Sequence, residues 1–359
     1  MEKLISPKLS ISVCILTRND EEFLDDCIKS LPKNIREIII LDANSTDRTL
    51  SIAKQYTSRI FSSKWNNDYS ELRNFFLTYV SSDWVLYMDA FERIAPESLK
   101  EFTPALLNKK NIAYMFNIVE MFQEKELETI SCRMFKRRSD IRFKRVMKES
   151  VTEDIQNIAK RENLSIAYPQ ITINRYNYLK YFDEADLYKE RIELAKNGLE
   201  IDSSDDIIET FYKLELGLSL NAFGEHEEAE KELNEVLKKI RKLDKKTVYN
   251  IPIFMQPYLF FAFKLSKAKK YEEGLKIIEE GVNIYNNSLM MLIRYCEFLY
   301  ANGMYKECLD HIAKIRFLKN EDKFYHSESI DYAMINKISG KLENLAYKKY
   351  MESQGIPEI

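Results

Sequence analysis

Three polar side chains close three apolar, strand-like runs near the N-terminus. Thr17, Asp42 and Asp89 are each the last residue of such a run. Hydroxyl and carboxylate groups can hydrogen-bond a polar ligand, and carboxylate oxygens can also hold a divalent cation. Ligands of parallel sheets bind at the carboxyl ends of the strands. We therefore expect these three residues to border one binding site.

These ends can meet only if the runs are parallel strands of one sheet. The strand-like runs alternate with segments of helical periodicity, in the order 10–17, 21–30, 37–42, 46–55, 69–80 and 83–89. This rhythm with short links predicts a parallel sheet covered by helices on both faces. From 112 to 176 the runs are longer, alternating and rich in aromatic residues, and we predict antiparallel strands that close the sheet.

After about residue 178 the strand-like runs stop, and the remainder is predicted to be helical. Residues recur there at a spacing of 34, namely Ala262 with Cys296, Tyr271 with Tyr305, and Gly274 with Cys308. That period is typical of tetratricopeptide repeats, in which small residues let paired helices approach closely. We predict an α/β domain at 1–178, a linking helix at 179–205 and a tetratricopeptide-like domain at 206–350. An irregular helical bundle is the alternative.

Composition excludes several classes of protein. A net charge of −3 gives no reason to expect a nucleic-acid partner. Apolar runs such as residues 38–41 are far too short for a membrane span. The first seven residues are mixed and polar, unlike a signal peptide. The five cysteines follow no metal-ligand spacing, which indicates reduced thiols and a cytoplasmic protein.

Four stretches carry a family resemblance: residues 12–21, 37–49, 64–74 and 84–90. In this order, and on these predicted strand ends, they resemble family 2 glycosyltransferases of the GT-A fold. Residues 133–135, 143–150 and 174–178, with Lys189 and Arg191, continue the resemblance on the acceptor side. The whole layout is similar to the peptide S-glycosyltransferases of sublancin-type bacteriocins. The resemblance implies inverting transfer of a sugar from a UDP-sugar to Cys, Ser or Thr of a peptide such as a bacteriocin precursor.

The same resemblance assigns residues to the donor site. Asp42 is expected to contact the uracil or ribose, and Arg73 the diphosphate. The full donor-binding set is Thr17, Arg18, Asn19, Asp42, Ser45, Trp65, Asp68, Arg73, Asp89, Ala90 and Arg175. Turn and helix-capping chemistry is the structural alternative for Thr17 and Asn19, and a solvated helix face is the alternative for Arg73.

The sequence departs from the family where a metal is usually held. The family places a second acidic residue after Asp89-Ala90, and this chain has Phe91. Lys148 and Arg175 stand where the subgroup often carries histidine. Mg²⁺ or Mn²⁺ is therefore doubtful, although Asp89 and Glu92 remain candidate ligands. Lys148 and Arg175 are expected to supply the positive charge instead, or the fold has kept its shape and lost turnover.

Glu149 is the candidate general base and Lys148 its catalytic neighbour. A carboxylate beside a lysine stays ionised, and a weak base is sufficient for a thiol acceptor. An ordinary surface ion pair is the alternative. Two rival functions stay open: a transferase of cell-surface polysaccharide synthesis, and a non-catalytic relic whose repeats bind a partner. Homodimer formation is left open as well.

Overall fold

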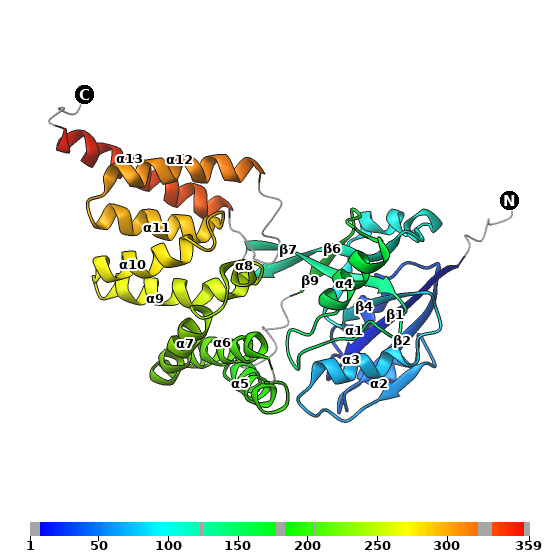
Figure 1. Ribbon diagram of the computed structural model, residues 1–359. Helices are drawn as coiled ribbons and strands as arrows, with labels where there is room; N and C mark the ends of the chain where they lie inside the picture. The colour runs from blue at the N-terminus through cyan, green and yellow to red at the C-terminus, as the bar shows by residue number, and fades with distance from the viewer. Residues whose placement is uncertain (1–7, 123–124, 177–183, 204, 322–331, 355–359) are drawn as a thin grey trace. The chain divides into compact units, whose positions relative to one another are not determined.

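The computed structural model describes residues 8–122, 125–176, 184–203, 205–321 and 332–354. The chain divides into two compact units, Met1–Ser203 and Ser204–Ile359. The first is an α/β unit and the second consists of helices (Figure 1). The predicted fold class, an α/β domain followed by helical repeats, is confirmed. Within the described residues no helix is long and apolar enough to cross a membrane.

One mixed sheet forms the centre of the first unit. Its strands are β1 (Leu9–Thr17), β2 (Ile35–Asp42), β3 (Ile60–Ser62), β4 (Trp84–Asp89), β5 (Glu92–Ile94), β6 (Asn111–Phe122), β7 (Lys125–Lys136), β8 (Ser165–Ala167) and β9 (Thr172–Arg175). Their order is β3-β2-β1-β4-β7-β6-β9-β5, and β8 pairs with β6. β1 pairs in parallel with both β2 and β4.

The strand register places the three polar ends at one edge. Thr17 pairs with Asp42, and Leu16 pairs with Asp89. Because β1, β2 and β4 are parallel, their carboxyl ends meet at that edge. The predicted meeting of these strand ends is therefore what the structure shows.

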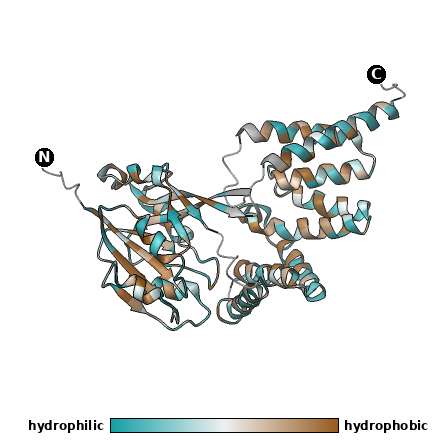
Figure 2. Cartoon of the chain, turned by 180° about the vertical axis from the view of Figure 1, so that it is seen from behind, coloured by the Kyte–Doolittle hydropathy of each residue, from teal (hydrophilic) through white to brown (hydrophobic). Residues whose placement is uncertain are grey.

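Helices cover both faces of this sheet. They are α1 (Leu24–Lys29), α2 (Thr49–Ala53), α3 (Tyr69–Leu77) and α4 (Thr152–Glu162), with short 3₁₀ segments at Pro96–Glu101 and Pro104–Leu106. A further helix, α5 (Glu184–Ile201), ends the first unit. Alternate β1 residues enter different cores: Val13 packs in the core with α1 and α2, and Cys14 in the core with α3 and α4. Strands buried on both faces are largely apolar, and helices carry one apolar stripe (Figure 2).

Two parts of the predicted outline need correction. Residues 112–176 were expected to be antiparallel strands, but they include α4, and β8 and β9 run parallel to β6. Val151, Ile155 and Ile158, at helical spacing, are the buried positions that fix α4. The helix expected at 46–55 begins only at Thr49. Residues 177–183, including the start of the predicted linking helix and the end of the 174–178 stretch, lie outside the described residues.

The second unit is built from paired helices. They are α6 (Asp206–Phe223), α7 (His226–Ile240), α8 (Lys245–Tyr249), α9 (Gln256–Lys267), α10 (Tyr271–Val282), α11 (Leu289–Ala301), α12 (Tyr305–Glu321) and α13 (Tyr332–Ser353), with a 3₁₀ turn at Pro252–Met255. Tyr271 and Tyr305 begin α10 and α12, so the 34-residue period sets equivalent helix starts. A Cβ at Gly274 would lie 2.1 Å from the Phe298 ring, which shows why a small residue is needed where α10 meets α11.

Candidate functional site

A cavity of about 780 Å³ opens at the carboxyl ends of β1 and β4. Nine of the predicted residues line it: Thr17, Arg18, Asn19, Trp65, Arg73, Asp89, Lys148, Glu149 and Arg175. They come from segments far apart in the sequence. Strand ends, α3, β9 and the loop before α4 thus bring candidate donor and acceptor residues to one place.

Other predicted residues do not line this cavity, although all of them lie in described parts of the chain. Asp42 is only 1% exposed, and its carboxylate accepts from the Ser45 amide at 3.1 and 3.3 Å. Asp68 caps α3 by accepting from the Glu71 amide at 3.0 Å. Ala90 and Glu92 are buried. The roles visible for Asp42, Ser45 and Asp68 are to fix loops that carry lining residues.

The loop after β1 is held by hydrogen bonds to the loop after β2. The Asn19 amide donates to Ser45 Oγ at 2.9 Å, and Asn19 Oδ1 accepts from the Thr46 amide at 2.8 Å. Asn19 has φ 57°, a left-handed conformation that asparagine tolerates. Asp47 accepts from the amides of Glu21 and Thr49 at 3.1 and 2.9 Å. Asp47 therefore ties this loop to the start of α2.

Asp20 lines the cavity and was not selected from the sequence. Its Oδ2 accepts from Thr17 Oγ1 at 2.9 Å and from the Arg18 amide at 2.8 Å. Burial raises the pKa of Asp20 to about 6, and the nearby carboxylates of Asp89 and Asp47 add to the rise. From sequence, an aspartate before a helix is indistinguishable from a cap. The structure instead shows a carboxyl group whose ionisation is unfavourable.

We expect Asp20→Asn to stabilise the protein at neutral pH. A carboxyl pKa of about 6 in the folded state and 3.8 in the unfolded state means that folding retains the proton. Stability is therefore lost as pH rises from about 4 to 6 and stays lower above that range. The variant lacks this loss, so its free energy of unfolding should exceed that of the wild type by on the order of 2 kcal/mol at pH 7, and the difference should vanish below pH 4. Urea unfolding at pH 4 and pH 7 measures both values; an advantage equal at the two pH values would contradict the assignment.

Aromatic rings and α5 form another wall of the cavity. Trp65 and Tyr69 lie with ring centroids 4.6 Å apart, and the Arg18 guanidinium lies 5.2 Å from the Trp65 centroid. Glu190 of α5 accepts from Arg18 Nη1 at 3.4 Å and from the Tyr69 hydroxyl at 3.3 Å. This helix lies within the predicted linking helix at 179–205, and it also lines the site, through Asp186, Leu187, Glu190, Arg191 and Leu194.

Arg73 joins two carboxylates at the centre of the cavity. Its Nη2 lies 2.6 Å from Asp89 Oδ1, and its Nε donates to Glu149 Oε1. The Arg73 residue is only 4% exposed, so the alternative of a solvated helix face is wrong. Burial alone would raise the pKa of Asp89, but Arg73, with Arg133 and Arg175, lowers it below the usual value. Glu149 is thus paired with Arg73 inside the protein.

A second buried cluster is centred on Glu92. Glu92 Oε1 lies 2.6 Å from Arg133 Nη2 and 3.0 Å from Arg175 Nη2, and its Oε2 accepts from the Asp89 amide at 3.0 Å. Arg133 also lines the cavity and was not selected from the sequence. The guanidinium carbons of Arg73 and Arg133 lie 5.0 and 4.8 Å from the Tyr87 ring centroid. The two clusters are therefore neighbours across one aromatic ring.

These contacts do not fit a divalent metal at the predicted position. The suggestion that Glu92 is a ligand needs correction, because its side chain is 0% exposed and both oxygens are engaged. One oxygen of Asp89 is held by Arg73. Phe91 lines the cavity, with the Arg175 guanidinium 5.8 Å from its ring centroid. Along the described residues no group of three His, Cys, Asp or Glu side chains could hold a metal ion.

Comparisons with known proteins agree with this geometry. Residues 12–182 match the family model described as glycosyl transferase family 2. A TPR repeat-containing protein of Synechococcus elongatus is 30% identical over 47% of this chain and 42% of its own length. The prophage-derived glycosyltransferase SunS of Bacillus subtilis is 31% identical over 32% of this chain and 25% of its own. The lipopolysaccharide core biosynthesis glycosyltransferase LpsC of Rhizobium meliloti is 35% identical over 28% of this chain and 38% of its own.

The chain thus spans less than half of the length of these curated relatives. The matched region contains most of the sheet and most of the residues that line the cavity, except those of α5. Residues 12–182 are a glycosyltransferase family 2 domain, followed in this chain by a unit of paired helices.

Proposed function

We propose that the chain is an inverting glycosyltransferase that moves a sugar from a UDP-sugar to Cys, Ser or Thr of a peptide such as a bacteriocin precursor. The observation that carries the proposal is the Asp89–Arg73–Glu149 bridge. It links the end of β4, where the family binds its donor, to the loop that holds the candidate base. Both lie in one cavity, together with the loop of Thr17, Arg18 and Asn19.

The proposed reaction is a direct displacement. The acceptor sulfur or oxygen attacks the anomeric carbon of the sugar, a new bond forms there, and the bond from that carbon to the diphosphate oxygen breaks. UDP leaves with the electron pair, and Glu149 takes the acceptor proton. A carboxylate paired with Arg73 is a weak base, which is adequate for a thiol because thiols ionise readily.

Positive charge for the leaving diphosphate is proposed to come from side chains. Lys148 and Arg175 line the cavity, and so do the more deeply buried Arg73 and Arg133. Cations fixed in a water-poor site stabilise developing negative charge without having to reorganise. Arg175 shares Glu92 with Arg133, so its charge is partly compensated.

The acceptor assignment rests on SunS and on the helical unit. SunS matches over only 115 residues, and stacked helix pairs offer extended surfaces that suit peptide segments. The test is incubation of the full chain with labelled UDP-sugars and a Cys-rich precursor peptide, followed by mass spectrometry. A hexose mass added to the peptide is expected, and donor hydrolysis without peptide modification would reject the peptide acceptor. The five cysteines are all free and buried, which supports a proposed cytoplasmic location.

A second candidate is a transferase of cell-surface polysaccharide synthesis, favoured by the match to LpsC. The same labelled donors, offered with lipopolysaccharide core oligosaccharide in place of peptide, distinguish the two. Label transferred to the saccharide alone would replace the peptide proposal. If no nucleotide binds at all, the α/β domain is a relic.

We expect the chain to bind UDP selectively over GDP and CDP. A ligand that binds only the folded protein at about 100 times its Kd stabilises it by about 2.7 kcal/mol, which raises Tm. The proposal includes a contact of the Asp42 carboxylate with the uracil or ribose of the bound donor. Asp42→Asn preserves an acceptor for the Ser45 amide and removes the charge, so a smaller UDP shift with an unchanged Tm of the free protein is expected. Thermal shifts with the three nucleotides measure this. Equal shifts for all three would reject the uridine assignment.

A further inference from the structure

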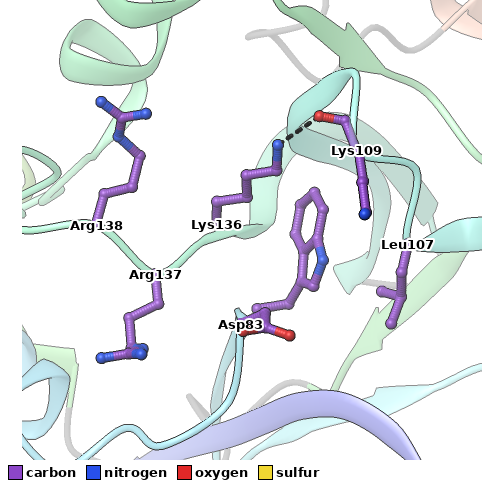
Figure 3. A pocket seen from close by; sticks show the side chains of 7 residues that line it. Asp83, Leu107, Lys109, Lys136, Arg137 and Arg138 are labelled. Atoms are coloured by element: carbon purple, nitrogen blue, oxygen red, sulfur yellow. Dashed lines mark hydrogen bonds between the residues drawn. The ribbon is translucent and has the colours of Figure 1, made fainter.

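A second cavity lies at the other end of β4 from Asp89 (Figure 3). Its volume is about 370 Å³, and it is lined by Asp83, Trp84, Leu107, Lys109, Lys136, Arg137 and Arg138. β4 runs from Trp84 to Asp89, so at about 3.3 Å per residue the two cavities are on the order of 17 Å apart. This cavity is therefore separate from the candidate active site.

The charges around this cavity are unbalanced. Arg138 is held by Asp140 and Glu162 at 2.7 and 2.8 Å. Within the described residues, Lys109, Lys136 and Arg137 have no carboxylate oxygen within 4.0 Å, although many other cations of the chain do. Asp83 is the one acidic residue in the lining. The cavity lining therefore has a net positive charge even when the ion pairs of Arg138 are taken into account.

These cations are positioned by the fold. Lys136 Nζ donates to the Lys109 carbonyl at 2.6 Å (Figure 3) and lies 5.7 Å from the Trp84 ring centroid. Arg137 Nε donates to the Ser82 carbonyl at 2.9 Å, and the Arg137 amide donates to the Asp83 carbonyl at 2.8 Å. Burial lowers the pKa of Lys136, and the charge of Arg138 lowers it further. A bound anion would reduce the electrostatic repulsion between these neighbouring cations.

We propose that this cavity binds a phosphate group, carried either by a small phosphorylated molecule or by a lipid headgroup. Ammonium and guanidinium groups from two separate segments, Lys109 and 136–138, match the several oxygens of a phosphate dianion. A volume near the lower limit of small-molecule sites fits one headgroup-sized ligand and not a polymer. Lys109 and Lys136 make the principal contacts, because neither amine has a carboxylate partner within the described chain.

The test measures phosphate binding to the full chain by calorimetry at low ionic strength. The calorimetric titration is carried out with and without saturating UDP, which keeps phosphate out of the first cavity. Lys136→Gln and Lys109→Gln are each expected to weaken phosphate affinity roughly tenfold. Lys110→Gln is the matched control, because Lys110 is an exposed neighbour outside the lining. Melting temperatures without phosphate verify that the variants are folded.

A second arm identifies the source of the phosphate. Sedimentation with phosphatidylcholine vesicles, with and without phosphatidic acid, shows whether a headgroup is held. Vesicle binding that is lost in Lys136→Gln and kept in Lys110→Gln supports the lipid source, and phosphate binding without vesicle binding supports the small molecule. Equal weakening in all three variants, or no saturable binding in either arm, overturns the proposal.

Discussion

Arg73→Met is expected to reduce transfer by at least 10²–10³-fold and to destabilise the fold by about 3–5 kcal/mol. Asp89 and Glu149 would then be left as buried carboxylates without their shared partner. Methionine keeps much of the side-chain volume, so the loss reflects charge more than packing. Initial rates and urea unfolding measure the two effects separately.

Two further variants distinguish catalysis from folding. Arg73→Lys keeps the charge but cannot present two donors in a fixed fork, so we expect it to recover stability better than activity. Combining Arg73→Met with Asp89→Asn and Glu149→Gln removes all three charges and should restore most of the lost stability, with no recovery of transfer. An Arg73→Met enzyme that stays within tenfold of the wild-type rate would contradict the central role of this bridge.

Local patterns were sufficient to predict the frame of the site. Apolar runs ending in Thr17, Asp42 and Asp89 predicted parallel strands with a common edge, and strand register depends on just such short, strongly patterned runs. The 34-residue spacing likewise predicted helix pairs, because a small residue such as Gly274 is needed at a close approach. Both inferences depend on patterns of residue type that can be recognised along the sequence.

The partners inside the cavity could not be predicted in the same way. Glu92 meets Arg133 and Arg175 only because β5, β7 and β9 come together in the folded sheet. Nothing in the residues around Glu92 distinguishes a buried pair from a metal ligand. The motif residues Asp42, Ser45 and Asp68 were assigned to the donor by resemblance, whereas their visible bonds are to backbone amides, three residues away for Asp42 and Asp68 and in the loop after β1 for Ser45. Carboxylates in turns and caps and carboxylates in ligand sites have the same sequence pattern.

Activity is expected to tolerate EDTA, because guanidinium groups already bind the carboxylate oxygens that a metal would need as ligands. Arg73 holds Asp89, Arg133 and Arg175 hold Glu92, and Phe91 offers no ligand atom. We expect the wild-type rate to change less than about twofold with EDTA or added Mn²⁺. Initial rates with a UDP-sugar and the peptide acceptor, in EDTA and in Mn²⁺, measure this.

The same assay tests which side chain replaces the metal. A positioned cation at a leaving diphosphate is worth about 2.7–4 kcal/mol, so Lys148→Ala should reduce kcat by about 10²–10³-fold in both conditions. Lys160→Ala, an exposed lysine of α4 outside the cavity, is the matched control and should leave the rate unchanged. Phe91→Asp alone should not create metal dependence, because its new carboxylate would lie beside Arg175 and pair with it. Loss of wild-type activity in EDTA, with recovery on adding Mn²⁺, would show that Asp89 does hold a metal and that Arg73 must leave it when the donor binds.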